Sequence, residues 1–200
     1  MDSLHRLEEI FARFPGIGPR QAKRFVYHLL NKPDASIKEF VDLVQEVKRS
    51  TAECDRCHRF FAANGSKKTA CSVCSDPSRD TSLLMVVARD SDFESIERSG
   101  AYKGLYFILG GTVPILDKEP EKRIRLKALL ARLAEDGSPA REIILSLNTT
   151  PEGENTAELV KAALPKEGLR VTVLGRGLST GAELEYVDGD TIRNALLNRH

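Results

Sequence analysis

The sequence Cys54-Asp55-Arg56-Cys57, followed after 13 intervening residues by Cys71-Ser72-Val73-Cys74, divides the chain into a helical first part and an α/β second part. Two thiolates in each C-x2-C pair can reach one ion, and two pairs close a tetrahedral four-sulfur cage with no open position for catalysis. The apolar stretches around the quartet are too short to form a core, so the ion would supply the local folding energy. The four cysteines therefore predict a structural Zn²⁺ site.

Two other interpretations of the cysteines remain open. Two disulfides would require an oxidising compartment, but the N-terminus lacks the basic and apolar regions of a signal peptide. A cytoplasmic protein with reduced thiols is therefore expected. Cys54, Cys57 and His58 also match a C-x-x-C-H haem attachment site, which would leave the second pair without a role. The 13 residues between the pairs, which include residues 64–68, are predicted to form a flexible, basic knuckle tip.

The composition predicts an ordinary soluble protein of one large or two small domains. The chain has 200 residues, of which 41% are apolar, and its net charge is +1. No apolar run approaches the roughly 18 residues of a membrane span, so a membrane partner is excluded. The charge is uneven, because residues 10–33 contain five basic side chains and no acidic one. Such a stretch favours contact with a polyanion.

The N-terminal part predicts a helical hairpin. Apolar residues from Leu4 to Phe14 recur at helical spacing behind Asp2 or Ser3 as a cap. Gly16 and Gly18 permit a tight reversal, after which proline opens a second helix over residues 19–30. A capping-box pattern at Ser36 then predicts a third helix over residues 36–49, which is expected to pack on the first two.

The second predicted helix has one apolar face and one basic face. Free backbone N–H groups at the glycine turn can bind a phosphate oxygen, and basic side chains on the next turn can neutralise neighbouring phosphates. This stretch resembles the helix-hairpin-helix motif of many DNA-repair proteins. The predicted DNA-binding residues are Gly16, Gly18, Arg20, Lys23 and Arg24. The alternatives are a plain helical hairpin whose basic face is only solvated, and an adaptor whose hairpin binds protein.

The second half of the chain predicts parallel βαβ units. Apolar runs at residues 83–87, 105–109, 143–147 and 171–174 are typical of buried strands. Helical patterns lie between them at 93–99, 121–135 and 155–163. A terminal helix is predicted at 191–198, anchored by Ile192, Leu196 and Leu197. Gly175 to Gly181 is predicted to be a turn, since its spacing fits neither nucleotide-binding fingerprint.

This order of strands and helices resembles the topoisomerase-primase (Toprim) fold, which carries out metal-dependent phosphoryl chemistry through a carboxylate cluster. Ala88 and Asn148 stand where that fold carries acidic residues, so no Mg²⁺ cluster is expected. Asp90 and Asp92 are interpreted as a helix cap. Glu152 and Glu154 are predicted to be an exposed acidic pair on a loop, suited to a basic partner.

Taken together, the hairpin, the cysteine quartet, the Toprim-like sheet and the segments Pro-Glu-Gly-Glu-Asn-Thr-Ala (151–157) and Gly-Ala-Glu-Leu-Glu-Tyr (181–186) resemble the bacterial RecR family of recombination mediators. The resemblance implies a non-enzymatic DNA clamp that assists recombinase loading at single-stranded gaps together with RecO and RecF. It also implies homo-oligomers, either dimers or ring-like tetramers. It makes the hairpin the DNA side, Cys54, Cys57, Cys71 and Cys74 the Zn²⁺ ligands, and Glu152 and Glu154 candidates for the partner side.

The resemblance predicts an α+β multidomain fold in four parts. These are a helix-hairpin-helix region (1–52), a four-cysteine zinc finger (53–78), a Toprim-like α/β domain with a mainly parallel sheet (79–174) and a C-terminal helical segment (175–200). Two features depart from the family: the long interval between the cysteine pairs, and Ala88 in place of the acidic residue after the first strand. The alternative function is a Toprim-type metal-dependent nuclease or primase.

Overall fold

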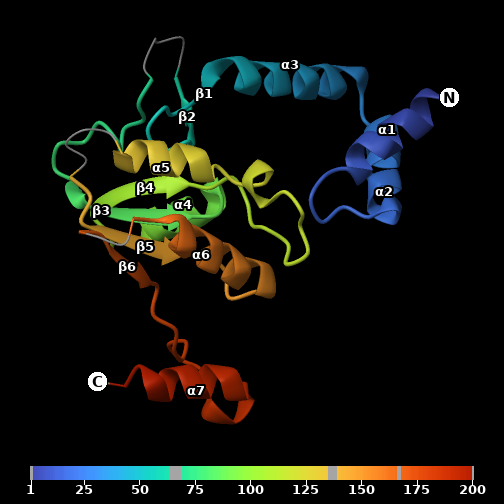
Figure 1. Cartoon of the computed structure of the whole chain (residues 1–200). Helices are drawn as coiled ribbons and strands as arrows, with labels where there is room; N and C mark the ends of the chain where they lie inside the picture. The colour runs from blue at the N-terminus through green and yellow to red at the C-terminus, as the bar shows by residue number, and fades with distance from the viewer. Residues whose placement is uncertain (1, 64–68, 135–138, 166–167, 200) are drawn as a thin grey trace. The chain divides into compact units, whose positions relative to one another are not determined.

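The computed structural model describes residues 2–63, 69–134, 139–165 and 168–199 (Figure 1). The chain separates into two compact units, Met1–Thr51 and Ala52–His200. Within the described residues there are seven α-helices and a parallel four-stranded sheet. The predicted fold class, a helical N-terminal region followed by a four-cysteine cluster and an α/β domain, is confirmed.

The first unit contains α1 (Ser3–Ala12), α2 (Pro19–Leu30) and α3 (Asp34–Ser50). The Asp2 side chain caps α1 by accepting a hydrogen bond from Leu4 N at 3.4 Å, as predicted. Helices α1 and α2 pack together around the rings of Phe11 and Phe25, whose centroids lie 5.8 Å apart. The two-helix hairpin is therefore held by an apolar contact on the inner side of both helices.

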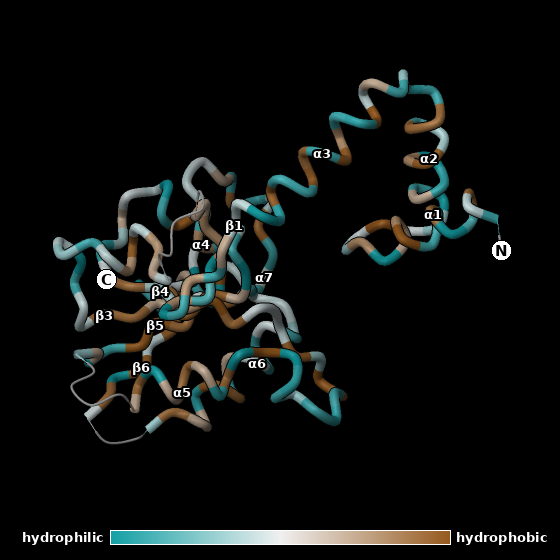
Figure 2. The backbone as a smooth tube through the Cα atoms, turned by 90° about the horizontal axis from the view of Figure 1, so that it is seen from above, coloured by the Kyte–Doolittle hydropathy of each residue, from teal (hydrophilic) through white to brown (hydrophobic). Residues whose placement is uncertain are grey.

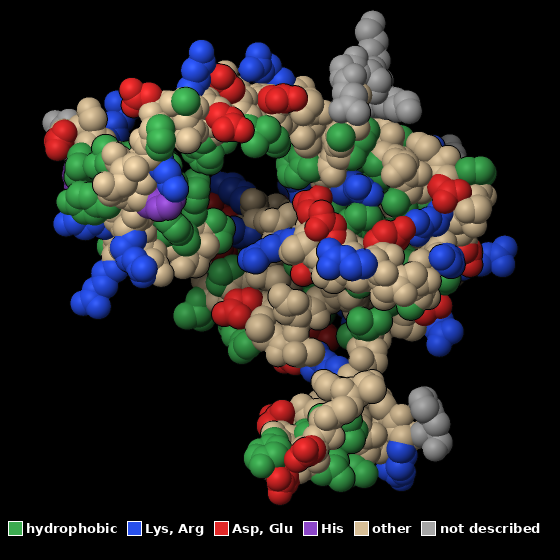
Figure 3. Space-filling view, turned by 180° about the vertical axis from the view of Figure 1, so that it is seen from behind, with side chains coloured by type: hydrophobic (Ala, Val, Ile, Leu, Met, Phe, Trp, Pro, Cys, Tyr) green, Lys and Arg blue, Asp and Glu red, His purple; other side chains and the backbone are tan. Residues whose placement is uncertain are grey.

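Helix α3 differs from the prediction in two ways. It begins at Asp34 behind Pro33, with no side-chain cap, so the capping box expected at Ser36 is wrong. Asp34 instead lies in the first turn, where a carboxylate interacts favourably with the helix dipole. The apolar stripe is also about half exposed rather than packed on α1 and α2: Phe40, Val41, Val44 and Val47. Apolar side chains (green) lie open on the helical unit in Figure 3.

The second unit is built on four parallel strands in the order β4-β3-β5-β6. Their bounds are β3 (Asp80–Val87), β4 (Gly104–Ile108), β5 (Glu142–Ser146) and β6 (Arg170–Val173). The intervening helices are α4 (Asp90–Ser99), α5 (Leu126–Ala134) and α6 (Pro151–Ala163), with a short 3-10 helix at Pro120–Lys122. All four strand predictions and the βαβ order are confirmed.

Successive residues of β3 point to opposite faces of the sheet, as the period of two requires. Leu84 and Val86 pack with residues of α5 and α6, whereas Met85 and Val87 pack with Phe93 of α4 and with the cysteines. The sheet is thus the middle of three layers, and the tube in Figure 2 shows its strands as largely hydrophobic stretches. The cysteine region forms part of one outer layer.

Two short elements flank this body. Strands β1 (Thr51–Glu53) and β2 (Phe60–Ala62) pair with each other and frame the first cysteine pair. Near the C-terminus, a 3-10 helix at Leu184–Tyr186 precedes α7 (Gly189–Leu197), so the terminal helix is present. Of its predicted anchor, Ile192 is half-buried, but Leu196 and Leu197 are 58% and 74% exposed, so the prediction is wrong for the two leucines. No helix within the described residues has the length and apolar character needed to span a membrane.

Candidate functional sites

The four cysteines come together in one buried cluster. Their Sγ atoms all lie within 4.8 Å of one another, and all four residues are buried. A tetrahedral Zn²⁺ with Zn–S bonds of about 2.3 Å would place its sulfurs about 3.8 Å apart, and Cys57 Sγ lies 3.6 Å from Cys71 Sγ. No disulfide joins the four. An all-sulfur set at this spacing fits a structural metal ion.

Local backbone geometry brings the two pairs together. The β1–β2 turn is closed by a hydrogen bond from Cys54 N to Arg59 O at 2.9 Å, and His58 adopts a left-handed conformation with φ 61°. The second pair is joined to the first by Cys71 N, which donates to Cys54 Sγ at 3.3 Å. Because all four cysteines share one cluster, the haem interpretation, which uses only the first pair, gains no support. Of the 13 residues predicted to form the knuckle tip, residues 64–68 lie outside the described residues.

The thiols of the cluster affect each other's protonation. Hydrogen bonding with Cys71 and then Cys74 raises the pKa of the Cys57 thiol far above its ordinary value. Hydrogen bonds from Cys57 and Cys74 lower the pKa of Cys71. The cluster therefore stabilises a thiolate at Cys71 through its neighbours' protons, and four thiolates at this distance require a cation to offset their repulsion.

The backbone around the first cysteine pair, here called the cysteine knuckle, also covers the outer edge of the sheet. Strand β4 is an edge strand, and its Ile108 N donates to Cys57 O at 2.9 Å. Arg132 of α5 donates from Nη1 to Arg56 O at 2.7 Å and to Tyr106 O at 2.8 Å. Sheet edges with free N–H and C=O groups invite unwanted pairing. The knuckle is thus part of the α/β core rather than an independent small unit.

The glycine turn between α1 and α2 exposes its backbone. Gly16 has φ +75°, which favours glycine, and Ile17 N donates to Phe14 O at 3.0 Å to close the turn. A Cβ added at Gly18 would have no atom within 4 Å, so the fold itself does not require a glycine there. Within the described residues, the N–H groups of Gly18, Arg20 and Gln21 have no hydrogen-bond partner.

The basic side chains follow directly from this turn. Arg20, Lys23 and Arg24 are exposed, and none of them forms an ion pair within the described part of the chain. Lys23 Nζ lies 5.9 Å from the centre of the Tyr27 ring. The structure therefore places the predicted glycines and cations on one exposed surface of the hairpin. The predicted apolar face of this helix is only partly covered, since Phe25 and Leu30 are 41% and 63% exposed.

Among the described residues, no acidic cluster lies at the carboxyl ends of the sheet strands. Ala88 is buried, Asp90 Oδ1 accepts from Phe60 N, and Asp92 Oδ2 accepts from Arg89 N, both at 2.9 Å. The interpretation as a helix cap is confirmed for Asp92, which accepts from the N-cap residue of α4, but Asp90 instead joins the start of α4 to β2. Among the residues that the structure describes, the cysteines are the only group of three or more potential metal ligands of the Cys, His, Asp and Glu types. Within the described ranges, no carboxylate cluster of the kind that Toprim-type Mg²⁺ chemistry uses is found.

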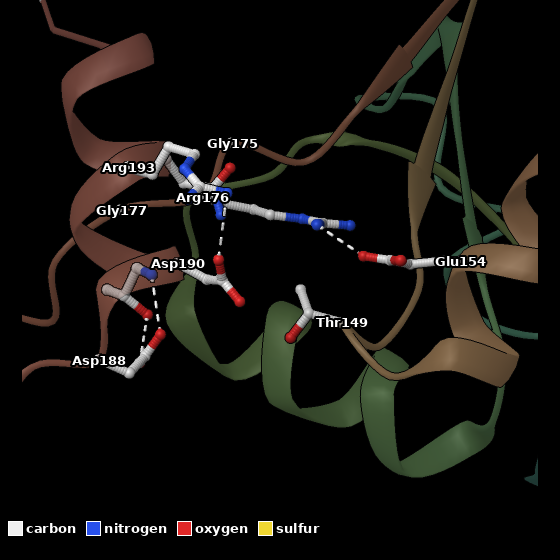
Figure 4. A pocket seen from close by; sticks show the side chains of 10 residues that line it. Thr149, Glu154, Gly175, Arg176, Gly177, Asp188, Asp190 and Arg193 are labelled. Carbon is white, nitrogen blue, oxygen red and sulfur yellow. Dashed lines mark hydrogen bonds and ion pairs between the residues drawn. The ribbon is translucent and has the colours of Figure 1, made fainter.

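Glu152 and Glu154 lie in the first turn of α6, so the prediction of a loop is wrong. Pro151 occupies the first helical position and Thr150 Oγ1 accepts from Gly153 N at 3.2 Å, which starts the helix earlier than expected. Glu152 is exposed and forms no ion pair among the described residues, whereas Glu154 pairs with Arg176 at 2.8 Å (Figure 4). The two glutamates are therefore not equivalent.

The cavity beside Glu154 is lined by polar groups that pair with one another. It has a volume of about 680 Å³ and lies between the start of α6 and the C-terminal segment (Figure 4). Arg193 contacts Asp190 at 3.4 Å, and Asp188 caps α7 by accepting from Thr191 N at 2.9 Å. No helix opens over residues 174–183, in agreement with the predicted turn.

Sequence reasoning missed what the rest of the 151–157 segment does. A Cβ on Gly153 would lie 2.0 Å from Asn148 O, so only glycine fits there. Thr156 is fully buried and its Oγ1 accepts from Val113 N at 2.8 Å. Asn155 Nδ2 donates to Val113 O at 3.0 Å. The only signal in the sequence was the presence of a glycine and two small polar residues inside an otherwise helical pattern.

Three family models together match most of the chain. Those described as "RecR, helix-hairpin-helix", "Toprim domain" and "RecR, C-terminal" match residues 4–48, 82–175 and 177–200. The protein named Recombination protein RecR of Bifidobacterium adolescentis is 38% identical over 198 residues, covering 98% of this chain and 95% of the relative. The chain belongs to the RecR family. The RecR proteins of Lactobacillus delbrueckii subsp. bulgaricus and Bacteroides thetaiotaomicron are each 35% identical, covering 97% and 94% of this chain and 94% and 89% of those relatives.

RecR family membership makes this chain a recombination-repair protein. The family models account for the helical hairpin, the α/β domain and the C-terminal segment in the order in which the structure shows them. The cysteine cluster lies between the first two matches, in residues 54–74. The predicted resemblance to RecR is therefore confirmed over nearly the full length of the chain.

Proposed function

We propose that this chain is a non-enzymatic DNA-binding mediator that assists recombinase loading at single-stranded gaps together with RecO and RecF. The observation that carries the proposal is the hairpin: three free N–H groups at a glycine turn, followed by three unpaired cations on the exposed face of α2, all within the described part of the chain. This donor set suits phosphate groups and reads no base sequence. The cytoplasm, at the nucleoid, is the expected location.

The geometry of Gly18 supports close approach of a phosphate backbone. Glycine is favoured where a backbone meets a ligand closely, and no contact among the described residues explains the glycine at this position. The N-terminal end of α2 contributes a partial positive charge that adds to Arg20 and Lys23. The free backbone N–H groups, the helix dipole and the basic side chains can therefore all attract the same phosphate group.

Arg20→Ala is expected to weaken DNA binding without unfolding the protein, because the side chain is exposed and forms no ion pair with any described residue. Removing one phosphate contact should reduce affinity about three- to tenfold at low salt and lower the slope of log K against log[salt] by about 0.7–0.9. Gly18→Ser keeps a good helix cap but adds a Cβ, so it should also weaken binding. Fluorescence anisotropy over a salt series measures both effects.

The matched control is Arg98→Ala, which removes an exposed cation of α4, outside the hairpin. It should leave the affinity and the salt slope unchanged. Binding that does not depend on salt, or Arg20 and Gly18 variants that bind as tightly as the wild type, would instead support a hairpin that contacts protein.

A homo-oligomer, either a dimer or a ring-like tetramer, is part of the proposal. One hairpin offers few cations, but several copies acting on one strand combine through effective concentration. The half-exposed stripe on α3 supports association of copies, since Phe40, Val41, Val44 and Val47 find no cover within the described residues of their own unit. Contiguous apolar patches of this kind mark interaction surfaces.

The double variant Phe40→Gln, Val44→Gln is expected to shift the assembly to smaller species and to weaken DNA binding at least about tenfold, because avidity is lost. Mass photometry and DNA titration on the same samples test both effects. Glu46→Gln, an exposed change on the same helix, is the control. A smaller species that binds DNA as tightly as the assembly would contradict the role of the oligomer.

Zn²⁺ is the proposed structural ion. Cys54, Cys57, Cys71 and Cys74 would hold it as four thiolates, and the ion would fix the knuckle against β4. It supplies folding energy and no reaction step, since all four positions are filled by sulfur.

RecO and RecF are the proposed protein partners, with Glu152 and Glu154 on the partner side. Their carboxylates lie in the first turn of α6, outside the hairpin unit. Because Glu154 already pairs with Arg176, Glu152 is the carboxylate of this pair that has no cation among the described residues. The boundaries after residues 52, 78 and 174 are proposed as the limits of the DNA-binding, zinc, α/β and C-terminal parts.

A further inference from the structure

The loop between β4 and the Pro120–Lys122 helix exposes two large apolar side chains. Ile115 and Leu116 are 62% and 91% exposed. They occupy the two central positions of a turn that is closed by Asp117 N donating to Pro114 O at 3.1 Å. Such positions usually carry glycine, proline, asparagine or aspartate. The turn therefore places apolar surface where the fold gains nothing from it.

This loop is held firmly on both sides. On one side, Val113 N donates to Thr156 Oγ1 at 2.8 Å, and Asn155 Nδ2 donates to Val113 O at 3.0 Å. On the other side, Arg123 Nε donates to Asp117 Oδ2 at 2.8 Å. Val113 itself is buried in the core. The backbone of the loop is ordered before any partner arrives, so binding would cost little conformational entropy.

An ordered turn with apolar side chains in water is typical of a binding loop. Function concentrates on loops that a rigid scaffold positions. An isolated exposed leucine needs no explanation. Here, however, an isoleucine and a leucine are adjacent on a turn that four hydrogen bonds hold in place. None of these bonds involves the side chains of Ile115 or Leu116. The side chain of Leu116 is therefore free to be buried in a partner protein.

The charge beside the loop indicates what kind of surface it fits. Asn155 and Thr156 form the hydrogen bonds to the loop, and they lie three and four residues after Glu152. All three residues therefore share one side of α6. Within the described residues Glu152 forms no ion pair, whereas Asp117 and Glu154 are engaged by Arg123 and Arg176. On the α6 side of the apolar tip, one carboxylate, that of Glu152, is therefore without an ion pair among the described residues, and on the loop itself Lys118 is exposed and likewise unpaired.

We propose that Ile115, Leu116 and Glu152 form one docking surface for a partner protein that presents an apolar pocket edged by Lys or Arg. This inference rests on the proposed function, because it gives the chemistry of the partner side that Glu152 marks. The apolar tip would supply most of the affinity, and the carboxylate would speed association and fix orientation.

The test measures binding of purified RecO and of purified RecF from the same bacterium to the full-length protein by surface plasmon resonance at several salt concentrations. Leu116→Asn places a turn-forming residue in the turn and should weaken binding of at least one of the two about tenfold or more, through faster dissociation. Glu152→Gln should slow association and flatten its salt dependence. Leu184→Asn, which alters another exposed leucine, should change affinity by less than about twofold.

Each outcome decides between the two proposals. Wild-type protein that binds neither RecO nor RecF overturns the partner part of the proposed function, and the docking surface with it. Wild-type binding that Leu116→Asn leaves unchanged overturns the docking surface alone. A Leu116→Asn variant whose own assembly mass falls shows that a second copy of this chain occupies the surface, which also overturns the inference. DNA affinity should be the same in all these variants, since the hairpin is untouched.

Discussion

Replacing Cys71 with serine is expected to abolish stoichiometric zinc binding and to unfold much of the α/β unit. Cys71 is buried and shares close contacts with the other thiols. Structural zinc sites supply on the order of 10 kcal/mol of folding free energy, comparable to the ~5–15 kcal/mol net stability of a typical protein. Because the knuckle packs on the same face of the sheet as Met85 and Val87, the loss should not stay local.

Zinc content per chain and thermal unfolding measure this effect. We expect the midpoint to fall by more than about 10 °C, if folded protein is obtained at all. Ser72→Ala, an exposed change between the same two cysteines, should preserve both the zinc content and the midpoint. In wild-type protein, four thiols should titrate after zinc is chelated under denaturing conditions. A disulfide-bonded protein would show none without reductant, and full stability of the serine variant would contradict the structural role.

Among the described glycines, Gly153→Ala is expected to be the most destabilising change to alanine. The new Cβ would lie 2.0 Å from Asn148 O and 2.9 Å from Asn148 C, and neither is the end of a flexible side chain. The start of α6 would have to move away from the end of β5. Overpacking of this kind costs about 1–3 kcal/mol and sometimes more. The movement would also strain the hydrogen bonds that Thr156 and Asn155 make to the loop.

Chemical denaturation should show a loss of about 3 kcal/mol or more for Gly153→Ala. Gly189→Ala is a close control, because Gly189 also lies in the first turn of a helix but a Cβ added there would have no atom within 4 Å. That change should be neutral or slightly stabilising. Equal denaturation midpoints for the two variants would show that the contact between Gly153 and Asn148 can relax freely. DNA binding through the hairpin should survive in both.

Much of the fold was predictable because its signals are local. Helix α2 begins and ends at the predicted residues, since proline and glycine at its start and a basic, apolar periodicity along it depend only on neighbouring residues. The parallel strands were found because strands buried on both faces form continuous apolar runs. The capping box at Ser36 was wrong because α3 begins two residues earlier, at Asp34 behind Pro33, without any side-chain cap.

The misjudged side chains share one cause. Periodicity identifies an apolar face, but it does not say whether another element of the same chain covers that face. The stripe on α3 and the leucines of α7 are apolar by pattern and yet exposed. These faces are exposed in a single copy of the chain. For the stripe on α3, we proposed that a second copy covers it.

The amino-acid sequence by itself determined the order of elements, the set of four cysteines and the basic glycine turn, because the signals for each lie close together along the chain. Only the tertiary structure decided that the cysteine knuckle covers the edge of β4, that Arg176 engages Glu154 but not Glu152, and that α6 holds the apolar loop. These pairings join residues from 22 to 51 positions apart. Strand order and crossovers bring such residues together, and no local pattern encodes them.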